Sequence, residues 1–279
     1  MLDQAPGRLQ NHRATPILTY HSLDESGSVT SVRPQFFHEH MHSLARRGFV
    51  GISLSQLLDG WDNITPLPAR PVVLTFDDGF ANLLEHAAPL LSELGFRATI
   101  FVVSGRCGQT NDWPNQAPDI PRLPLLSWSE LAQMVTAGFE MGAHSVTHRP
   151  LTEITQAEAE REIVESKETI EQRMGRPVNT FAYPFGVFSR ANYEVVRKHF
   201  RGACSVELGK ARRENDRHQL PRLDVYYLRQ PALFQLFETL PGQAYLGLRG
   251  AGRNVRAGLV RRGLFSQSKP DEKHGDGQR

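Results

Sequence analysis

The chain has 279 residues, of which 39% are hydrophobic and 22% are charged, and its formal net charge is only +2. This is ordinary globular composition, and the length suits one large α/β domain or two small ones. The small net charge argues against a nucleic-acid-binding protein. Only two cysteines are present, Cys107 and Cys204, and their wide separation argues against a disulfide framework or a cysteine metal site.

The chain divides into three parts by composition. We expect a flexible N-terminus over residues 1–14, one folded domain over 15–240, and a basic, partly disordered tail over 241–279. The N-terminus lacks the apolar core of a secretory signal, and no stretch reaches 18 apolar residues. We therefore expect a cytoplasmic protein. The sequence gives no indication of an oligomeric state.

Short apolar runs alternate with amphipathic segments through most of the chain. In chain order we expect a strand at 16–21, a helix at 34–48, strands at 49–53 and 71–76, a helix at 81–95, a strand at 97–103, a helix at 127–138, a strand at 139–145, a helix at 155–175, a strand at 179–184, a helix at 190–200, and strands at 202–206 and 220–226. Repeated strand–helix alternation predicts a parallel sheet or barrel with helices outside.

Two segments depart from this alternation. Residues 107–128 hold four prolines and two tryptophans, and such a segment is either a lid over a site or a solvent-exposed loop. Residues 241–279 contain eight Lys/Arg and three Asp/Glu, a net charge of 8 − 3 = +5. Arg249, Arg253 and Arg256 recur there at helical spacing, which suits peripheral contact with a membrane surface, although we favour a frayed, solvated tail.

Two adjacent carboxylates end the predicted strand in "VVLTFDDGF", residues 72–80. Asp77 and Asp78 stand at the carboxyl end of that strand, where parallel α/β folds place their active sites. Neighbouring carboxylates raise each other's pKa unless a cation compensates them. The motif is also common in plain turns, so alone it does not decide between a bound cation and a turn.

Two histidines follow a second predicted strand, in "GAHSVTH", residues 142–148. His144 and His148 together with one carboxylate form a sufficient ligand set for a catalytic zinc with one open position. A strand precedes them, so we expect the ligands on a loop and the general base elsewhere. One of the two aspartates can supply that base.

Two further strand ends carry polar or aromatic groups. "FAYPFG", residues 181–186, presents Tyr183, Pro184 and Phe185, and "TYHSL", residues 19–23, presents His21. Each alone is explained by packing or by a turn. A barrel would bring all four strand ends together, which favours one functional site.

"LTFDDG", "HSVTH" and "FAYPFG" occur in that order, and with them the chain resembles the polysaccharide deacetylase family, carbohydrate esterase family 4 with the NodB-homology domain. The resemblance covers roughly residues 15–230. It implies a catalytic domain folded as a distorted (β/α) barrel of about seven βα repeats. It also implies a hydrolase that removes acetyl groups from an N-acetylhexosamine-containing polysaccharide or glycoconjugate.

The resemblance implies that Asp77 is the general base and that Asp78, His144 and His148 hold a divalent metal, usually Zn²⁺, with Co²⁺ as an alternative. This is chemically coherent, because a bound metal polarises an amide carbonyl and lowers the pKa of water. A backbone N–H, that of Phe185 beside Tyr183 and Pro184, is expected to stabilise the oxyanion.

The chain departs from the family pattern in two places. Ala182 stands where much of the family has the arginine that orients the base, and we expect Arg222 in "LPRLDV" to replace it. The late leucine–histidine motif that supplies the general acid is absent after residue 206. His218 is one candidate for the acid. We assign the role to His21, because the chain resembles an exopolysaccharide-type subgroup that opens with a "YH" segment.

Two alternatives share this candidate site. One is a metal-dependent hydrolase of C–N bonds in small non-sugar amides. The other is a non-catalytic glycan-binding pseudoenzyme that keeps the metal site. The absence of the arginine and of the late histidine motif favours this alternative. The presence of Asp77 argues against it, since a binding module needs no base.

Overall fold

The computed structural model describes residues 14–114 and 116–261, the last nine of these by their backbone alone. Seven parallel strands close into a ring in the order β1-β10-β9-β8-β7-β6-β5, and β5 pairs again with β1. The expected (β/α) barrel is therefore confirmed. The ring consists of β1 (Ile17–Tyr20), β5 (Pro71–Phe76), β6 (Ala98–Val102), β7 (Phe139–Ala143), β8 (Thr180–Ala182), β9 (Gly202–Leu208) and β10 (Leu220–Asp224).

Three short strands lie outside this ring. β4 (Val50–Ile52) pairs with Pro71–Val73 at the start of β5, on the edge opposite β1. β2 (Ser22–Leu23) and β3 (Ser31–Val32) form a small parallel pair directly after β1. They lead the chain from the end of β1 into the first helix.

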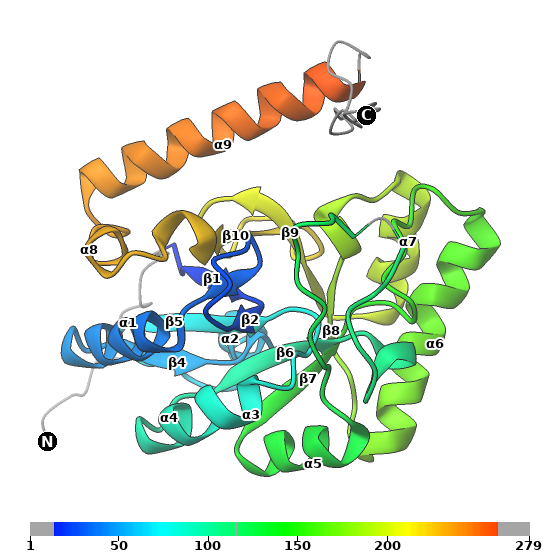
Figure 1. The fold of residues 1–279 in the computed structure, drawn as a ribbon, viewed down its shortest axis with the longest axis horizontal. Helices are drawn as coiled ribbons and strands as arrows, with labels where there is room; N and C mark the ends of the chain where they lie inside the picture. Colours follow the sequence, from blue (N-terminus) through cyan, green and yellow to red (C-terminus); the bar gives the residue numbers. More distant parts are fainter. Residues whose placement is uncertain (1–13, 115, 262–279) are drawn as a thin grey trace, which may run out of the picture.

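Helices cover the outside of the barrel (Figure 1). They are α1 (Pro34–Arg46), α2 (Leu54–Trp61), α3 (Leu83–His86), α4 (Ala88–Glu93), α5 (Trp128–Thr136), α6 (Gln156–Met174), α7 (Arg190–His199), α8 (Pro231–Phe234) and α9 (Leu240–Arg261). Several begin with a capping box. Ser127 and Thr155, for example, each accept a hydrogen bond from the backbone N–H of a glutamate three residues on.

Burial explains why these segments form their elements. The last five residues of β5 are fully buried, as expected for a parallel strand covered on both faces. On α1 the apolar side chains of Phe37, Met41 and Leu44 are completely buried. At about 25 cal/mol per Å², each such side chain contributes roughly 1.5–3 kcal/mol of transfer free energy.

Two helix expectations were wrong in detail. The helix predicted at 81–95 is split into α3 and α4 at Ala87. Pro89 follows the break, and proline removes a helical N–H and clashes with the carbonyl four residues earlier. Helix α2 was missed, although Ser53 forms a capping box with Gln56 and four apolar residues at helical spacing are buried.

Residues 240–261 form the long helix α9, where a frayed tail was favoured from sequence. The helix is anchored near its start, because Leu246 is buried and the Tyr245 hydroxyl donates to the backbone carbonyl of Tyr227. The Arg249 guanidinium lies over the rings of both tyrosines. The side chains of Arg253 and Arg256 and all of residues 262–279 lie outside the described residues.

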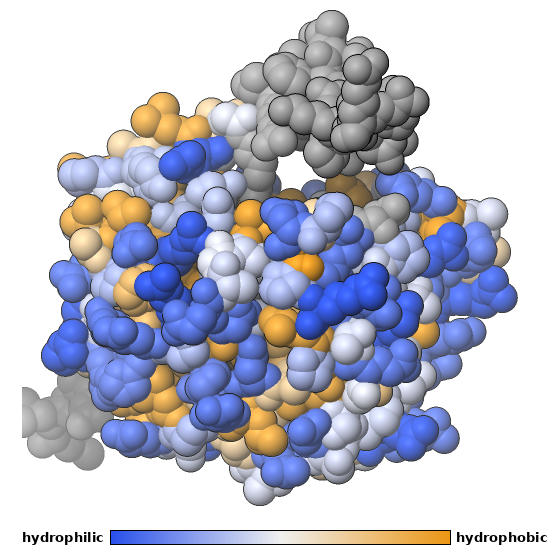
Figure 2. Space-filling model, in the orientation of Figure 1, coloured by the Kyte–Doolittle hydropathy of each residue, from blue (hydrophilic) through white to orange (hydrophobic). Residues whose placement is uncertain are grey.

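The surface around α8 and α9 is partly apolar (Figure 2). Exposed leucines lie there on or beside both helices: Leu233, Leu236, Leu240 and Leu248. Within the described part of the chain, no helix is long and apolar enough to cross a bilayer.

Candidate active site

Asp77 and Asp78 lie at the carboxyl end of β5 and are almost fully buried, with 3% and 5% of their surface exposed. The backbone N–H of Asp77 donates to the Tyr20 carbonyl, which ties this strand end to β1. Asp78 has a left-handed backbone, with φ of 71°. The two carboxylates therefore leave the strand in different directions and meet different partners.

Asp78 contacts the two predicted histidines. Its Oδ1 atom lies 3.5 Å from Nε2 of His144 and 3.3 Å from Nε2 of His148. All three ligand atoms lie within 4.8 Å of one another, and all three side chains are buried. Within the described residues, this is the one cluster of three His, Cys, Asp or Glu side chains that could hold a metal ion.

The geometry of the cluster fits a divalent ion. Two ligand atoms each about 2.0–2.1 Å from one tetrahedral ion lie about 3.3 Å apart, close to the observed separations. Oδ1 of Asp78 is buried without a hydrogen-bond partner, which is costly unless a cation satisfies it. Nδ1 of His144 donates to the Ala182 carbonyl at 2.7 Å. That bond fixes the tautomer that leaves Nε2 free to bind a metal.

The electrostatics of His148 and Asp78 favour the same role. Burial lowers the pKa of His148 to about 3, so its imidazole is neutral as a metal ligand must be. Burial alone would raise the pKa of the Asp78 carboxyl, but the imidazoles of His148 and His144 outweigh it and bring that pKa below its usual value. The carboxyl is therefore ionised at neutral pH.

Asp77 is paired with Arg222 from β10. The guanidinium donates from Nη1 to Oδ1 at 2.7 Å and from Nη2 to Oδ2 at 2.8 Å, while its Nε donates to the Ser205 carbonyl. Burial would raise the pKa of Asp77, and the Arg222 charge more than offsets this, so the pKa lies well below its usual value. Asp77 is thus held as an oriented carboxylate.

His21 follows β1 and is more exposed than Asp77. Its Nε2 atom lies 3.9 Å from Oδ2 of Asp77, and a quarter of its side chain is accessible. The other candidate for the acid, His218, hydrogen-bonds through Nε2 to the Phe200 carbonyl and is buried beside Tyr193. The structure brings His21, and not His218, beside Asp77.

The three predicted side chains that follow β8 lie in different surroundings. Tyr183 is buried, stacks on Phe188, and donates its hydroxyl to the His218 carbonyl, so the phenol packs in the core. Pro184 is also buried. Phe185 is 42% exposed and its ring lies 4.6 Å from that of His148. In this turn the Gly186 N–H donates to the Tyr183 carbonyl and the Val187 N–H donates to the Pro184 carbonyl.

Two contributors were not identified from the sequence. The ring of Trp113, from the long loop, lies 4.2 Å from that of His148, whose Nδ1 is buried without a hydrogen-bond partner. Glu162 on α6 accepts hydrogen bonds from the backbone N–H groups of Val146 and Thr147. Trp113 and Phe185 fix the His148 ring by packing, while Glu162 fixes the loop that carries it.

The long loop at 107–126 lies beside the site. It bridges to the segment after Asp78 through the antiparallel pair Phe80–Leu125, and the Leu126 N–H donates to the Gly79 carbonyl. The sequence left two interpretations of this loop open, a lid over a site and a solvent-exposed loop. Its placement agrees better with the lid.

Residues with strained backbone conformations lie at the same strand ends. Among the described residues, five that are not glycine have positive φ, and four of them belong to the strand ends described above. They are Asp78, Ser145, His148 and Phe185. Such conformations cost about 1–3 kcal/mol each and are retained where function fixes the geometry.

A parallel barrel with an ionised carboxylate beside a cluster that could hold a metal ion has side chains suited to hydrolysis. Residues 65–200 match the sequence profile of the polysaccharide deacetylases. YxkH of Bacillus subtilis (strain 168), assigned to the polysaccharide deacetylases, is 24% identical over 211 residues, which is 75% of this chain and 71% of that protein.

One further relative and one solved structure are also similar to the chain. The poly-β-1,6-N-acetyl-D-glucosamine N-deacetylase of Staphylococcus aureus (strain MSSA476) is 25% identical over 140 residues, 47% of this chain and 46% of the relative. The chain thus spans less than half the length of that relative. The fold matches the Streptococcus pyogenes deacetylase PplD in complex with acetate, with a TM-score of 0.67 and 20% identity over 77% of this chain and 93% of the other.

In sequence over residues 65–200 and in its fold, the chain resembles the polysaccharide deacetylases, as its motifs indicated. It is an enzyme of the class that hydrolyses non-peptide C–N bonds.

Proposed function

We propose that the protein is a metal-dependent N-deacetylase that hydrolyses the acetamido group of N-acetylhexosamine units in a polysaccharide or glycoconjugate. The observation that carries the proposal is that the two adjacent aspartates at the end of β5 have different partners. Asp78 faces two imidazoles, while Asp77 is held by an arginine from β10. A binding module would need the first arrangement without the second.

We propose that Asp78, His144 and His148 hold a divalent ion, with Zn²⁺ favoured by one carboxylate and two imidazoles. Such an ion would polarise the acetamide carbonyl and promote ionisation of water. Asp77 accepts the proton of the attacking water, and Arg222 keeps that carboxylate ionised and oriented. We propose that the backbone N–H of Phe185 donates to the developing oxyanion.

His21 is proposed as the general acid that protonates the leaving amine. Its partial exposure at the rim and its place 3.9 Å from Asp77 suit a group that meets the substrate. Replacing His21 by Ala should lower kcat by about 10²–10⁴-fold, the range for loss of a general acid or base. Metal content should stay unchanged, with His86→Gln as the control. Loss of metal would instead make His21 a ligand.

The substrate class is proposed from the staphylococcal relative, whose name specifies an N-acetylglucosamine polymer. Acetate release should be measured on β-1,6- and β-1,4-linked N-acetylglucosamine oligomers, lipid-linked N-acetyl sugars and small non-sugar amides. We expect release from a sugar substrate and little from the simple amides. Preference for the amides would support the small-amide hydrolase, and tight glycan binding with no release would support the pseudoenzyme.

A further inference from the structure

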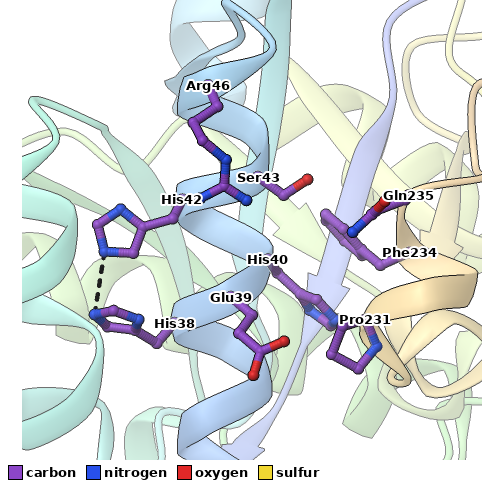
Figure 3. A pocket seen from close by; sticks show the side chains of 9 residues that line it. All are labelled: His38, Glu39, His40, His42, Ser43, Arg46, Pro231, Phe234 and Gln235. Carbon is purple, nitrogen blue, oxygen red and sulfur yellow. Dashed lines mark hydrogen bonds between the residues drawn. The ribbon is translucent and has the colours of Figure 1, made fainter.

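A second pair of histidines lies on α1, outside the cluster at the strand ends. The segment "HEHMH", residues 38–42, puts His38 and His42 one helical turn apart, and residues at this spacing share one helix face. Their Nε2 atoms are 3.1 Å apart, and the rings meet edge to face. In Figure 3 these two side chains lie on one side of α1 and face each other, while His40 lies on the other side near Phe234.

The separation of the two nitrogens fits a shared metal ion. Two imidazole nitrogens each about 2.0–2.1 Å from one ion lie about 3.3 Å apart at a tetrahedral angle and about 2.9 Å apart at a right angle. The observed 3.1 Å lies between these values, so one ion can bind both nitrogens with little movement. Without an ion, one of the two facing nitrogens must carry a proton and the other must not.

The surroundings supply room but no third protein ligand. His38 and His42 border a cavity of about 230 Å³ between α1 and α8, which Figure 3 shows. Glu39 follows His38 as in the zinc-binding HExxH helices, yet its carboxylate accepts a hydrogen bond from Gln35. Among the described residues, the one three-ligand cluster is that of Asp78. Water would therefore complete the coordination at the α1 pair.

We propose that His38 and His42 form a second site, which chelates one divalent transition-metal ion on α1. Imidazole ligands suit Zn²⁺, Ni²⁺ and Cu²⁺, and affinity in this series is highest for Cu²⁺. The role proposed for this site is metal binding alone. The inference is independent of the proposed function.

The test is Cu²⁺ titration of the full chain by calorimetry after removal of all metal. The His38→Gln/His42→Gln variant should bind one equivalent fewer than the wild-type protein, and the His86→Gln control should bind the same number. In an Asp78→Ala/His144→Ala/His148→Ala background, the electron paramagnetic resonance spectrum of the α1-bound Cu²⁺ should show coupling to two imidazole nitrogens.

Acetate release by the His38→Gln/His42→Gln variant, loaded with Zn²⁺, should equal that of the wild-type protein, which separates this site from the one at the strand ends. An equal number of Cu²⁺ equivalents in the wild-type protein and in this variant would overturn the proposal. So would a spectrum without coupling to two imidazoles, because the residual ion would then lie elsewhere.

Discussion

Replacing Asp77 by Asn is expected to reduce kcat/KM for acetate release by about 10²–10⁴-fold, the range for loss of a general base. An amide cannot accept the proton of the attacking water, although it keeps the shape of the carboxylate. Metal content should remain that of the wild-type protein, because Asp78 and the histidines supply the ligands. The change should be measured as steady-state acetate release alongside metal analysis.

The control for this variant concerns stability. The Asp77→Asn substitution would leave the buried Arg222 guanidinium without its charged partner, and breaking a buried pair costs about 3–5 kcal/mol. Activity should therefore be measured below the unfolding transition. The double variant Asp77→Asn/Arg222→Met removes both charges and should regain stability without regaining activity. Wild-type turnover by Asp77→Asn would show that the base is misassigned.

Replacing Arg222 by Met is expected to cost about 3–5 kcal/mol of unfolding free energy and most of the activity, because it leaves the buried Asp77 carboxylate unpaired. The matched control is Arg222→Lys, which keeps one charge but cannot donate two parallel hydrogen bonds. The losses of stability and activity should be smaller for Arg222→Lys than for Arg222→Met. Chemical denaturation and kcat/KM are the measurements.

The pH dependence of stability and activity tests whether Arg222 acts through its charge or only by filling space. In the wild-type protein the pKa of Asp77 is depressed, so its contribution to stability is present above the unfolded pKa of about 3.9 and lost as pH falls through the folded value. Without Arg222, burial should raise the pKa of Asp77 in the folded state above its value in the unfolded state. Stability of Arg222→Met should then fall as pH rises from about 4, and the acidic limb of activity should move to higher pH. An unchanged profile would mean that Arg222 only fills space.

The fold could be predicted from sequence to the extent that its elements are periodic and buried. The run 71–76 and the helix at 155–175 match β5 and α6 closely, because a continuous apolar run and a capping box are local signals. Ring closure depends on β1 pairing with both β5 and β10, which no local pattern encodes. The break at Ala87 follows from Pro89, a local signal that the helix prediction did not take into account. The order of α9 depends on its packing with Tyr227.

The candidate site could be predicted where its residues stand in motifs. Asp77, Asp78, His144 and His148 each follow a recognisable strand, so their convergence is a consequence of parallel topology. Arg222 was inferred from a missing arginine, and its bidentate contact depends on the register of β10. Trp113 and Glu162 were missed, since their roles depend on how a long loop and α6 pack over the HSVTH segment.

The measurement that tests the central claim most directly is acetate release by the wild-type protein made metal-free and then reconstituted. The chain should be dialysed against a chelator until metal analysis finds none, assayed on the best N-acetylated substrate, and assayed again after one equivalent of Zn²⁺ is added. We predict that release is abolished and then restored, and that an Asp78→Ala/His148→Ala variant is not restored. Full release by the verified metal-free protein would contradict the account.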